Sequence, residues 1–371
     1  MTCEEIPASP PRAWVEINTA NLAKNLAFAK QASGCGIMAV VKAGAYGHGL
    51  EEISKVLERK GVEFLGVANI TEARRIREAG VTSPIYLLGA SWDGEREEIV
   101  ARNVIPCIST VAEARAFDEI AARRGVVLAV HLAVDTGMGR GGFLPEVLPL
   151  EMAELESFRS LCIEGIASHL SSSDEDESFT REQIEAFENA VKQTGGSGHF
   201  KWRHLSNSGG ILGYTAGCCN LARPGLMLYG ASPFPAQQQK LHNVMTLKSR
   251  VTLVRTLPAG HGISYGRSFI TVRPTKVATV GIGYGDGYPR HISGNGAEVF
   301  IRGERHPLIG RVTMDQIMVA LPDDSDICVS DEVELFGANI RVTEVARWAD
   351  TIAWEVFTGI MPRVQRIYLE D

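Results

Sequence analysis

The stretch GIMAVVKAGAYGHG, residues 36–49, combines two patterns that decide both the fold and where to look for a site. Its first part is a continuous apolar run, which is typical of a strand buried on both faces of a sheet. The run ends on Lys42 and then breaks into small residues, a tyrosine and a histidine. A strand that ends on a lysine would place an amine at the mouth of a parallel barrel, where barrel enzymes carry their active sites.

Seven further apolar runs of similar length follow, with helical segments between them. The segments NITEARRIREAG and TVAEARAFDEIAARRG each begin near an Asn or Thr that can cap a helix, and each ends on glycine. Eight strands that alternate with helices predict a (β/α)8 barrel of the TIM type, and a doubly wound open sheet is the alternative with the same alternation. The eight runs are GIMAVVK, EFLGVAN, PIYLLGA, VIPCIS, VLAVHLAVD, IEGIASHL, KWRHLSN and LARPGLMLYG.

The sequence changes character near Pro233. The segment PFPAQQQK indicates a linker between about 232 and 241, and helical periodicity is mostly lost after it. Short β-rich runs such as MTLKSRVTLVRTL, TKVATVGIGYG and DEVELFG follow, separated by Gly, Pro and Asp. We therefore expect a barrel domain over residues 1–241 and a separate, mostly-β domain over 242–371, with the first residues, up to about 17, able to pack with the second domain.

Composition argues against several classes of function. The 371 residues carry 37 Lys and Arg against 44 Asp and Glu, and they contain no basic stripe that would follow a nucleic acid. Seven cysteines without C-x-x-C spacing predict neither a disulfide framework nor a zinc site, and they fit a reducing compartment. The first residues lack the pattern of a signal peptide, and no later stretch is apolar enough to cross a bilayer. We expect a cytoplasmic protein without a membrane or metal partner.

Four residues at predicted strand ends could form one pocket. Lys42 would sit in a partly apolar barrel mouth, where desolvation favours a neutral amine that can condense with an aldehyde. His169 would lie at the end of the sixth strand, Ser208 in NSGG after the seventh, and Gly225 in RPGLMLYG at the eighth. The loops after strands seven and eight are a recurrent phosphate site in barrels. Each residue alone is also compatible with an ordinary core or turn position, but together they predict a pocket for an aldehyde that carries a phosphate.

These residues also resemble the fold-type III pyridoxal-phosphate enzymes and, within them, the alanine racemase family. The match runs from about Arg12 to Asp371, and several motifs in order at family-like spacings are far more specific than any one of them. The motifs are AVVKAGAYGHG, VDTGMGRGGF, SHL, NSGG, RPGLMLYG, SYGRSF, GYGDGYPR and GRVTMDQ.

The resemblance implies a role for each matching residue. Lys42 would hold pyridoxal 5'-phosphate as an internal aldimine and act as one catalytic base, and Tyr265 from the other subunit of a homodimer would be the second. The remaining roles are Tyr46, Ser208, Gly225 and Leu226 at the phosphate, Arg223 at the pyridine nitrogen, His169 beside the ring, Arg140 near the cofactor hydroxyl and the substrate carboxylate, and Tyr284, Met314 and Asp315 beside Tyr265 from the other subunit.

The residue types suit racemisation. A proton must leave Cα on one face and return on the opposite face, so two bases on opposite sides of a planar intermediate are needed. An arginine at the ring nitrogen, such as Arg223, would leave that nitrogen unprotonated and weaken the electron sink, which restrains side reactions such as transamination. Tyr265 is a poor base at its ordinary pKa of about 10, so it would need cationic neighbours, for which Arg140 and His169 are the candidates.

The sequence departs from the family at two positions. Many alanine racemases carry a lysine, often carbamylated, two residues before the aspartate of DTGMGR, and here that position is Ala133. An anion from solvent or a rearranged hydrogen bond would then have to hold Arg140. A tyrosine common in the family, which contacts the phosphate and forms a wall of the substrate pocket, is here Trp354. Indole is larger and lacks the hydroxyl acceptor, which favours alanine over larger substrates.

The expected function is that of a pyridoxal-phosphate-dependent isomerase that interconverts L-alanine and D-alanine, a reaction that can supply D-alanine for peptidoglycan. A racemase for serine or for many amino acids, and a pyridoxal-phosphate-binding protein without turnover, are the alternatives. Barrel proteins of the latter kind have a single domain and lack residues equivalent to 242–371. A barrel decarboxylase of the same cofactor class fits SYGRSF and Arg223 less well. A Schiff-base aldolase without cofactor is a further alternative, and an absorbance spectrum would distinguish it from a protein that carries pyridoxal phosphate.

Overall fold

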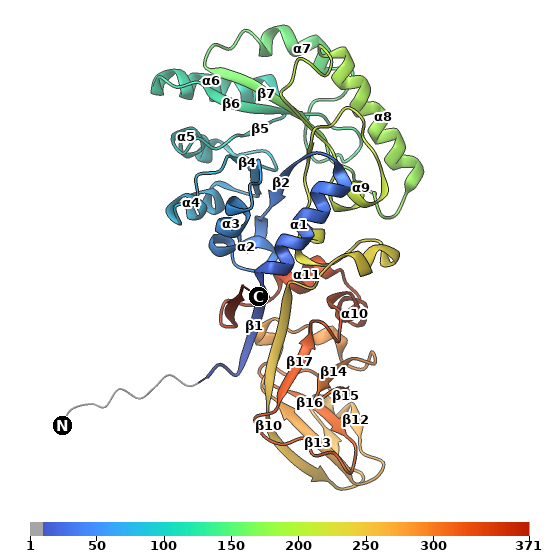
Figure 1. Ribbon diagram of the computed structural model, residues 1–371. Coiled ribbons are helices and arrows are strands. Elements are labelled where there is room, and N and C mark those ends of the chain that lie inside the picture. The colour runs from blue at the N-terminus through green and yellow to red at the C-terminus, as the bar shows by residue number, and fades with distance from the viewer. Residues whose placement is uncertain (1–9, 371) are drawn as a thin grey trace, which may run out of the picture. The chain divides into compact units, whose positions relative to one another are not determined.

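The computed structural model describes residues 10–370, which divide into two compact units (Figure 1). One unit comprises residues 21–242, and the other joins residues 10–20 to residues 243–370. The chain thus passes through the second unit, builds the first, and then returns.

Residues 21–242 form a parallel eight-stranded sheet in the order β4-β3-β2-β9-β8-β7-β6-β5. The two edge strands are linked by a parallel bridge between Tyr86 and Ile105, so the sheet is a nearly closed barrel. The barrel prediction is confirmed, and the open doubly wound alternative is wrong. Each predicted apolar run contains one strand: β2 Gly36–Val40, β3 Phe64–Val67, β4 Ile85–Leu87, β5 Cys107–Ile108, β6 Leu128–Ala133, β7 Leu161–Ala167, β8 Trp202–His204 and β9 Leu221–Ala222.

Helices surround this barrel and begin where the sequence places caps. Asn69 accepts a hydrogen bond from the backbone of Glu72 at the start of α4, and Thr110 accepts one from Glu113 at the start of α6. The helices are α1 Thr19–Ser33, α2 Lys42–Tyr46, α3 Leu50–Arg59, α4 Ile70–Glu78, α5 Arg96–Ala101, α6 Val111–Arg124, α7 Leu148–Leu155, α8 Glu177–Gln193 and α9 Ser208–Gly213, with short 3-10 turns η1 Asp93–Glu95, η2 Leu226–Tyr229 and η3 Pro235–Lys240.

The segment PFPAQQQK is an ordered part of the barrel unit, where a linker was expected. It contains η3, and the side chain of Gln238 donates to the carbonyl of Gly230 and accepts from the backbone of Ser232. The boundary between the two units lies between His242 and Asn243.

The second unit is mostly β, as predicted. Its main sheet has the order β13-β16-β15-β14-β17-β10-β1-β18, and an added pairing of β13 with β10 closes six of these strands on themselves. The strands are β1 Ala13–Asn18, β10 Met245–Leu257, β13 Thr275–Val280, β14 Glu298–Ile301, β15 Glu304–Ile309, β16 Ile317–Leu321, β17 Glu332–Phe336 and β18 Gln365–Leu369, with a small ribbon of β11 Gly262–Ile263 and β12 Phe269–Ile270. Short helical elements are η4 Tyr265–Arg267, η5 Tyr284–Asp286, η6 Arg290–Ile292, α10 Val342–Trp348 and α11 Ala353–Thr358.

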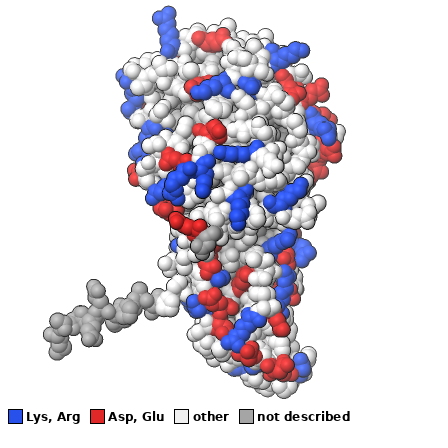
Figure 2. All heavy atoms as spheres, in the orientation of Figure 1, with Lys and Arg blue, Asp and Glu red and all other residues white. Residues whose placement is uncertain are grey.

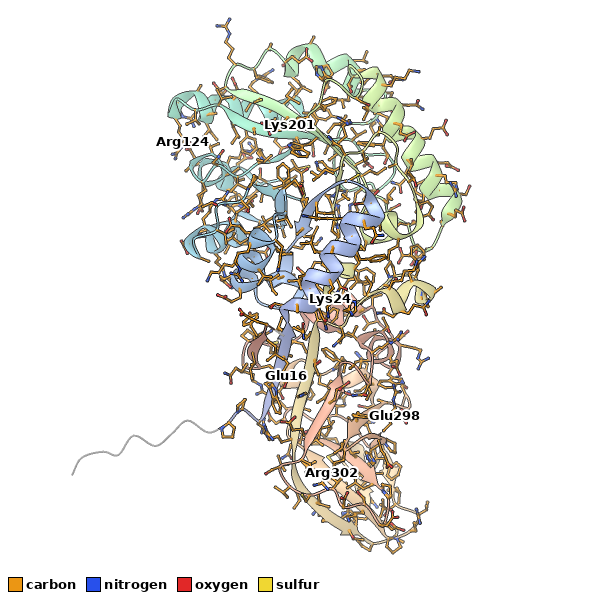
Figure 3. All side chains as sticks on the ribbon, in the orientation of Figure 1. Glu16, Lys24, Arg124, Lys201, Glu298 and Arg302 are labelled. Atoms are coloured by element: carbon orange, nitrogen blue, oxygen red, sulfur yellow. The ribbon has the colours of Figure 1, made fainter. Side chains whose placement is uncertain are left out.

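Strand β1 belongs to this second unit, although it precedes the barrel in the sequence. It pairs antiparallel with β10 and parallel with β18. Glu16 on β1 forms an ion pair with Lys248 on β10 at 2.9 Å (Figure 3 labels Glu16). Long-range pairing of this kind cannot be read from local periodicity.

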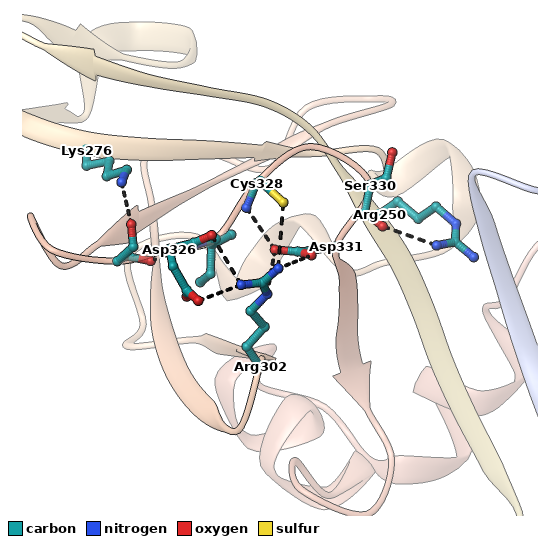
Figure 4. A network of polar contacts seen from close by, with 9 residues as sticks. Arg250, Lys276, Arg302, Asp326, Cys328, Ser330 and Asp331 are labelled. Carbon is teal, nitrogen blue, oxygen red and sulfur yellow. Dashed lines mark hydrogen bonds and ion pairs between the residues drawn. The ribbon is translucent and has the colours of Figure 1, made fainter.

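A polar network joins loops of the second unit (Figure 4). Arg302, in the turn between β14 and β15, forms ion pairs with Asp326 at 2.7 Å and with Asp331 at 2.9 Å. Asp331 also accepts a hydrogen bond from the backbone of Cys328. Because Arg302 and Asp326 are exposed, their ion pair fixes loop geometry more than it adds stability.

Charge is mixed over the face of the molecule shown in Figure 2, where lysines and arginines alternate with aspartates and glutamates. No helix among residues 10–370 is long and apolar enough to cross a membrane.

Candidate active site

Lys42 follows β2 and opens an unusual turn. Ala43, Gly44, Ala45 and Tyr46 all have left-handed backbone angles, with φ between 54° and 64°. Left-handed helical conformation costs an L-residue about 1–2 kcal/mol, and only one of these four residues is glycine. Such strain persists only where the surroundings enforce it, and it is concentrated at functional sites.

Buried contacts hold this turn. The backbone of Ala45 donates to the carbonyl of Val41 at 2.7 Å, and that of Gly47 donates to Ala43 at 3.0 Å. The Tyr46 ring stacks on Tyr229 with 4.7 Å between centroids, and the Tyr229 hydroxyl donates to the carbonyl of Val40. Burial raises the pKa of the Tyr46 phenol, so this hydroxyl stays protonated and can donate a hydrogen bond.

The predicted phosphate residues lie together beside this turn. The Ser208 hydroxyl accepts hydrogen bonds from the backbone of Gly225 at 3.1 Å and of Met227 at 3.2 Å. A Cβ atom at position 225 would collide with the Tyr46 hydroxyl, so only glycine fits there. Leu226 is fully buried at the start of η2. The sequence therefore brings hydroxyls and backbone amides from three separate loops to one place.

Arg223 lies buried at the end of β9 with a fixed guanidinium. Its Nη1 donates to the carbonyl and to Nδ1 of His204, at 2.8 and 2.7 Å. Its Nη2 donates to Nδ1 of His169 at 3.1 Å and to the carbonyls of Ser168 and Leu205. Carbonyls at the ends of two strands thus orient this cation before any ligand arrives.

These contacts fix the protons on three histidines. Arginine can only donate, so Nδ1 of His169 and Nδ1 of His204 must both be acceptors, and each ring carries its proton on Nε2. Nε2 of His204 then donates to Nδ1 of His131 at 2.8 Å. The remaining proton of His131 sits on its Nε2, which is buried without a partner among the described residues. Sequence analysis missed His131 and His204, and their only signal was a histidine inside an apolar strand.

Burial, and secondarily Arg223, lowers the pKa of all three rings, that of His131 to about 3 and those of His169 and His204 well below the usual value. His169 is therefore neutral near pH 7, so of the two candidate cations for Tyr265 only Arg140 is charged.

We expect ring-carbon NMR shifts of His131 and His204 to stay constant from pH 8 to pH 5 and to report the Nε2-H tautomer. In urea both should titrate near the ordinary pKa of about 6.5. In the unfolded chain these two histidines bind protons below about pH 6.5, whereas in the folded chain they stay neutral. The free energy of unfolding should therefore fall as the pH drops below about 6.5. Titration of either folded ring above pH 5 would contradict the assignment.

The electrostatics of Lys42 favour a neutral amine. Burial lowers its pKa, Arg140 and Arg223 lower it further, and Glu72 raises it. A neutral amine is the form that condenses with an aldehyde.

Ala133 ends β6 and is buried in the barrel interior beside Met38 and Tyr86. The loop after it is shaped by Asp135, whose carboxylate accepts from the backbones of Gly137 and Gly139, each at 3.0 Å. Arg140, at the end of that loop, is exposed and makes no hydrogen bond or ion pair within residues 10–370.

Tyr265 belongs to the second unit and is 66% exposed on η4. It lines a groove of about 730 Å³ together with Arg255, His261 and Thr313. Ser264 before it and Arg267 after it have positive φ, so the turn that presents the phenol is also strained.

The predicted residues Tyr284, Met314 and Asp315 lie together in the same unit. Backbone of Tyr284 donates to the carbonyl of Thr313, and that of Gly285 to the carbonyl of Met314. Arg363, which sequence analysis missed, joins Asp315 at 2.8 Å and Asp286 at 2.7 Å. Tyr284 and Met314 are exposed, and Trp354 lies half-buried on α11.

The structure therefore gathers the predicted residues into two sets. Lys42, Tyr46, Arg140, His169, Ser208, Arg223, Gly225 and Leu226 belong to the barrel unit, and Tyr265, Tyr284, Met314, Asp315 and Trp354 belong to the β-rich unit. Among residues 10–370, no group of His, Cys, Asp and Glu could hold a metal ion.

Comparison with known proteins matches both units. The family model described as "Alanine racemase, N-terminal domain" matches residues 17–233, and "Alanine racemase, C-terminal domain" matches residues 244–368. An alanine racemase of Geobacter sp. (strain M21) is 38% identical over 372 residues, which cover 96% of this chain and 98% of the relative.

Two solved structures extend the match. Alanine racemase of Clostridium difficile 630 superposes with a TM-score of 0.92 at 34% identity, covering 98% of this chain and 97% of that one. Alanine racemase of Bartonella henselae, with covalently bound pyridoxal phosphate, superposes with a TM-score of 0.88 at 30% identity, covering 97% and 100%.

Proposed function

The chain belongs to the alanine racemase family and shares its activity, the interconversion of L- and D-alanine, and we propose that Lys42 and Tyr265 are the two bases and pyridoxal phosphate the cofactor. The observation that carries the proposal is a half-buried lysine at the barrel mouth, whose pKa is lowered by burial, in the same unit as a cradle of hydroxyls and amides. The test is an absorbance spectrum of the purified protein, followed by borohydride reduction and peptide mapping.

The residues present fit pyridoxal phosphate. The hydroxyls of Tyr46 and Ser208 and the backbone of Leu226 offer hydrogen-bond donors for its phosphate. Gly225 lies beside them, with its amide donating to Ser208, and its missing Cβ leaves the Tyr46 hydroxyl room to reach the phosphate. Arg223 offers a fixed donor for the ring nitrogen. Once bound, the cofactor supplies an electron sink that acidifies the Cα–H bond of a bound amino acid.

The residues of the chain divide the remaining work. Arg223 keeps its own proton, because its guanidinium is charged at any physiological pH, and so limits protonation of the group that it contacts. His169 is held neutral with its free N–H on Nε2 and can donate from there. Arg140 is placed to bind the substrate carboxylate through two N–H groups.

Lys42 and Tyr265 exchange the Cα proton from opposite faces. Lys42 takes or returns it on one face as a neutral amine. Tyr265 acts on the other face, where the positive charge of Arg140 would stabilise the phenolate.

We assign Tyr265 to the partner subunit of a symmetric homodimer. Exposed Tyr265, Tyr284 and Met314 surround one part of the β-rich unit, and large exposed apolar groups of this kind mark interaction surfaces. In a twofold dimer the same contact occurs twice, so two sites are formed.

Ala133 leaves Arg140 without the carbamylated lysine of many relatives. An anion from solvent or a rearranged hydrogen bond would hold the guanidinium instead, consistent with its lack of a partner among residues 10–370. Free cysteines at all six described positions fit a cytoplasmic protein that supplies D-alanine for peptidoglycan.

Alanine is the proposed preferred substrate, with serine or broad-specificity racemisation as the alternative. Replacing Trp354 with alanine should widen the pocket and raise kcat/KM for serine relative to alanine by about tenfold, since specificity is a ratio of such constants. Trp354→Tyr, which keeps an aromatic wall, should retain the preference for alanine. Faster turnover of serine than of alanine by the unaltered protein would favour the alternative.

A further inference from the structure

The side chain of Glu72 joins two neighbouring loops at the barrel mouth. Its Oε1 accepts a hydrogen bond from the backbone of Gly44, at 3.2 Å, in the left-handed turn after Lys42. Its Oε2 accepts one from the backbone of Ala68, at 3.0 Å, in the loop after β3. The carboxylate is buried, and both of its oxygens are used on backbone amides. The turn has a further side-chain contact at its other end, where Nδ1 of His48 lies 2.8 Å from the carbonyl of Tyr46.

An equivalent glutamate, Glu113, lies elsewhere in the barrel, at loops that do not carry Lys42. Glu113 opens α6 as Glu72 opens α4, and its Oε2 accepts from the backbone of Ser109 at 2.8 Å. The same carboxylate lies beside Ser91 in the loop after β4, whose backbone and side chain both favour its charged form. The second oxygen of Glu72 serves the turn after Lys42.

Glu72 is also the carboxylate that opposes two cations near Lys42. Arg140 and Arg223 both disfavour the charged form of the amine, while Glu72 favours it. His169 is neutral, and burial raises the pKa of the Tyr46 and Tyr229 phenols, so these groups add no charge. Removing the charge of Glu72 would leave Lys42 among cations only.

We propose that Glu72 is a positioning residue for Lys42: its carboxylate holds the left-handed turn through Gly44 and sets the charge balance around the amine. This rests on the proposed function, in which Lys42 carries the cofactor. Glu72 acts on Lys42 through its hydrogen bond to the backbone of Gly44 and through its negative charge, without contact to the substrate.

The first test measures hydrogen exchange in the full-length protein over the segment of residues 42–49. Glu72→Ala should speed exchange of the Gly44 amide at least about tenfold, because a hydrogen bond to a charged acceptor is lost. Glu113→Ala removes the equivalent carboxylate and Asn69→Ala removes the cap of the same helix, so neither should change exchange of this segment. Unchanged exchange in Glu72→Ala, or an equal rise in Asn69→Ala, would refute the hydrogen-bonding role.

The second test uses Glu72→Gln, which keeps the shape of the side chain and is suited to the case in which Glu72→Ala does not fold. Bound cofactor is first removed from the full-length protein. Pyridoxal phosphate is then added, and the rate of its covalent attachment is measured at a series of pH values to give the midpoint of the pH profile. The midpoint should move to lower pH in Glu72→Gln, because the neutral amine becomes more favourable. Glu113→Gln should leave the midpoint in place.

The two tests separate this proposal from the proposed function. If the midpoint pH is unchanged or higher in Glu72→Gln, and borohydride still labels Lys42, the electrostatic role of Glu72 is wrong and the proposed function stands. Labelling of another lysine overturns the proposed function itself.

Discussion

Replacing Lys42 with alanine is expected to abolish covalent attachment of pyridoxal phosphate and to lower kcat for alanine racemisation by about four orders of magnitude. The variant loses a covalent anchor and a base in one step. The unaltered protein should be yellow, and borohydride reduction should fix the cofactor to the peptide that contains Lys42.

Lys55→Ala is the matched control. Lys55 lies on α3 of the same unit and pairs with Glu52 on the surface, so its loss should change neither colour nor rate. A colourless protein under cofactor-replete expression, or reduction that labels a different lysine, would remove the basis of the proposed site.

Much of the barrel could be predicted because its strands are buried on both faces. Such strands need continuous apolar runs, and the runs from GIMAVVK to LARPGLMLYG contain the eight strands. Helix caps such as Asn69 and Thr110 were also visible, because a cap depends on a few neighbouring residues. Patterns of this kind act over one or two turns, so the sequence alone displays them.

The remaining features depend on contacts between distant residues. Ala43 and Ala45 show no local preference for a left-handed turn, which is held instead by Tyr229 and Glu72. The chain from Arg223 through His204 to His131 links three strands, and the pairing of Arg363 with Asp315 spans 48 residues. No short motif can reveal such pairs.

The structure gives geometric support to some of the site residues that were assigned by resemblance, and not to others. Tyr46, Ser208 and Gly225 contact one another within one unit, so their shared role as a cradle has geometric support. Tyr265 and Lys42 belong to different units. Their cooperation therefore calls for an experiment that detects a site made from two subunits.

Mixing two inactive variants, Lys42→Ala and Tyr265→Phe, should restore activity once their subunits exchange. In a twofold dimer each site would combine Lys42 of one chain with Tyr265 of its partner. A mixed dimer then has one site that lacks both groups and one in which both are intact. Random pairing makes about half of the dimers mixed, each with one working site of two, so activity should recover to roughly a quarter of wild type.

The outcome depends only on which chain supplies each base. If both came from one chain, every site in every dimer would still lack Lys42 or Tyr265, and mixing would restore nothing. Mixing Lys42→Ala with a second Lys42 variant, Lys42→Met, is the control, since no site can then regain its lysine. Subunit exchange itself is verified by mass spectrometry of differently tagged chains. Full exchange without recovery would exclude the shared site, and covalent attachment at Lys42 would stand unaffected, because that bond forms within one barrel.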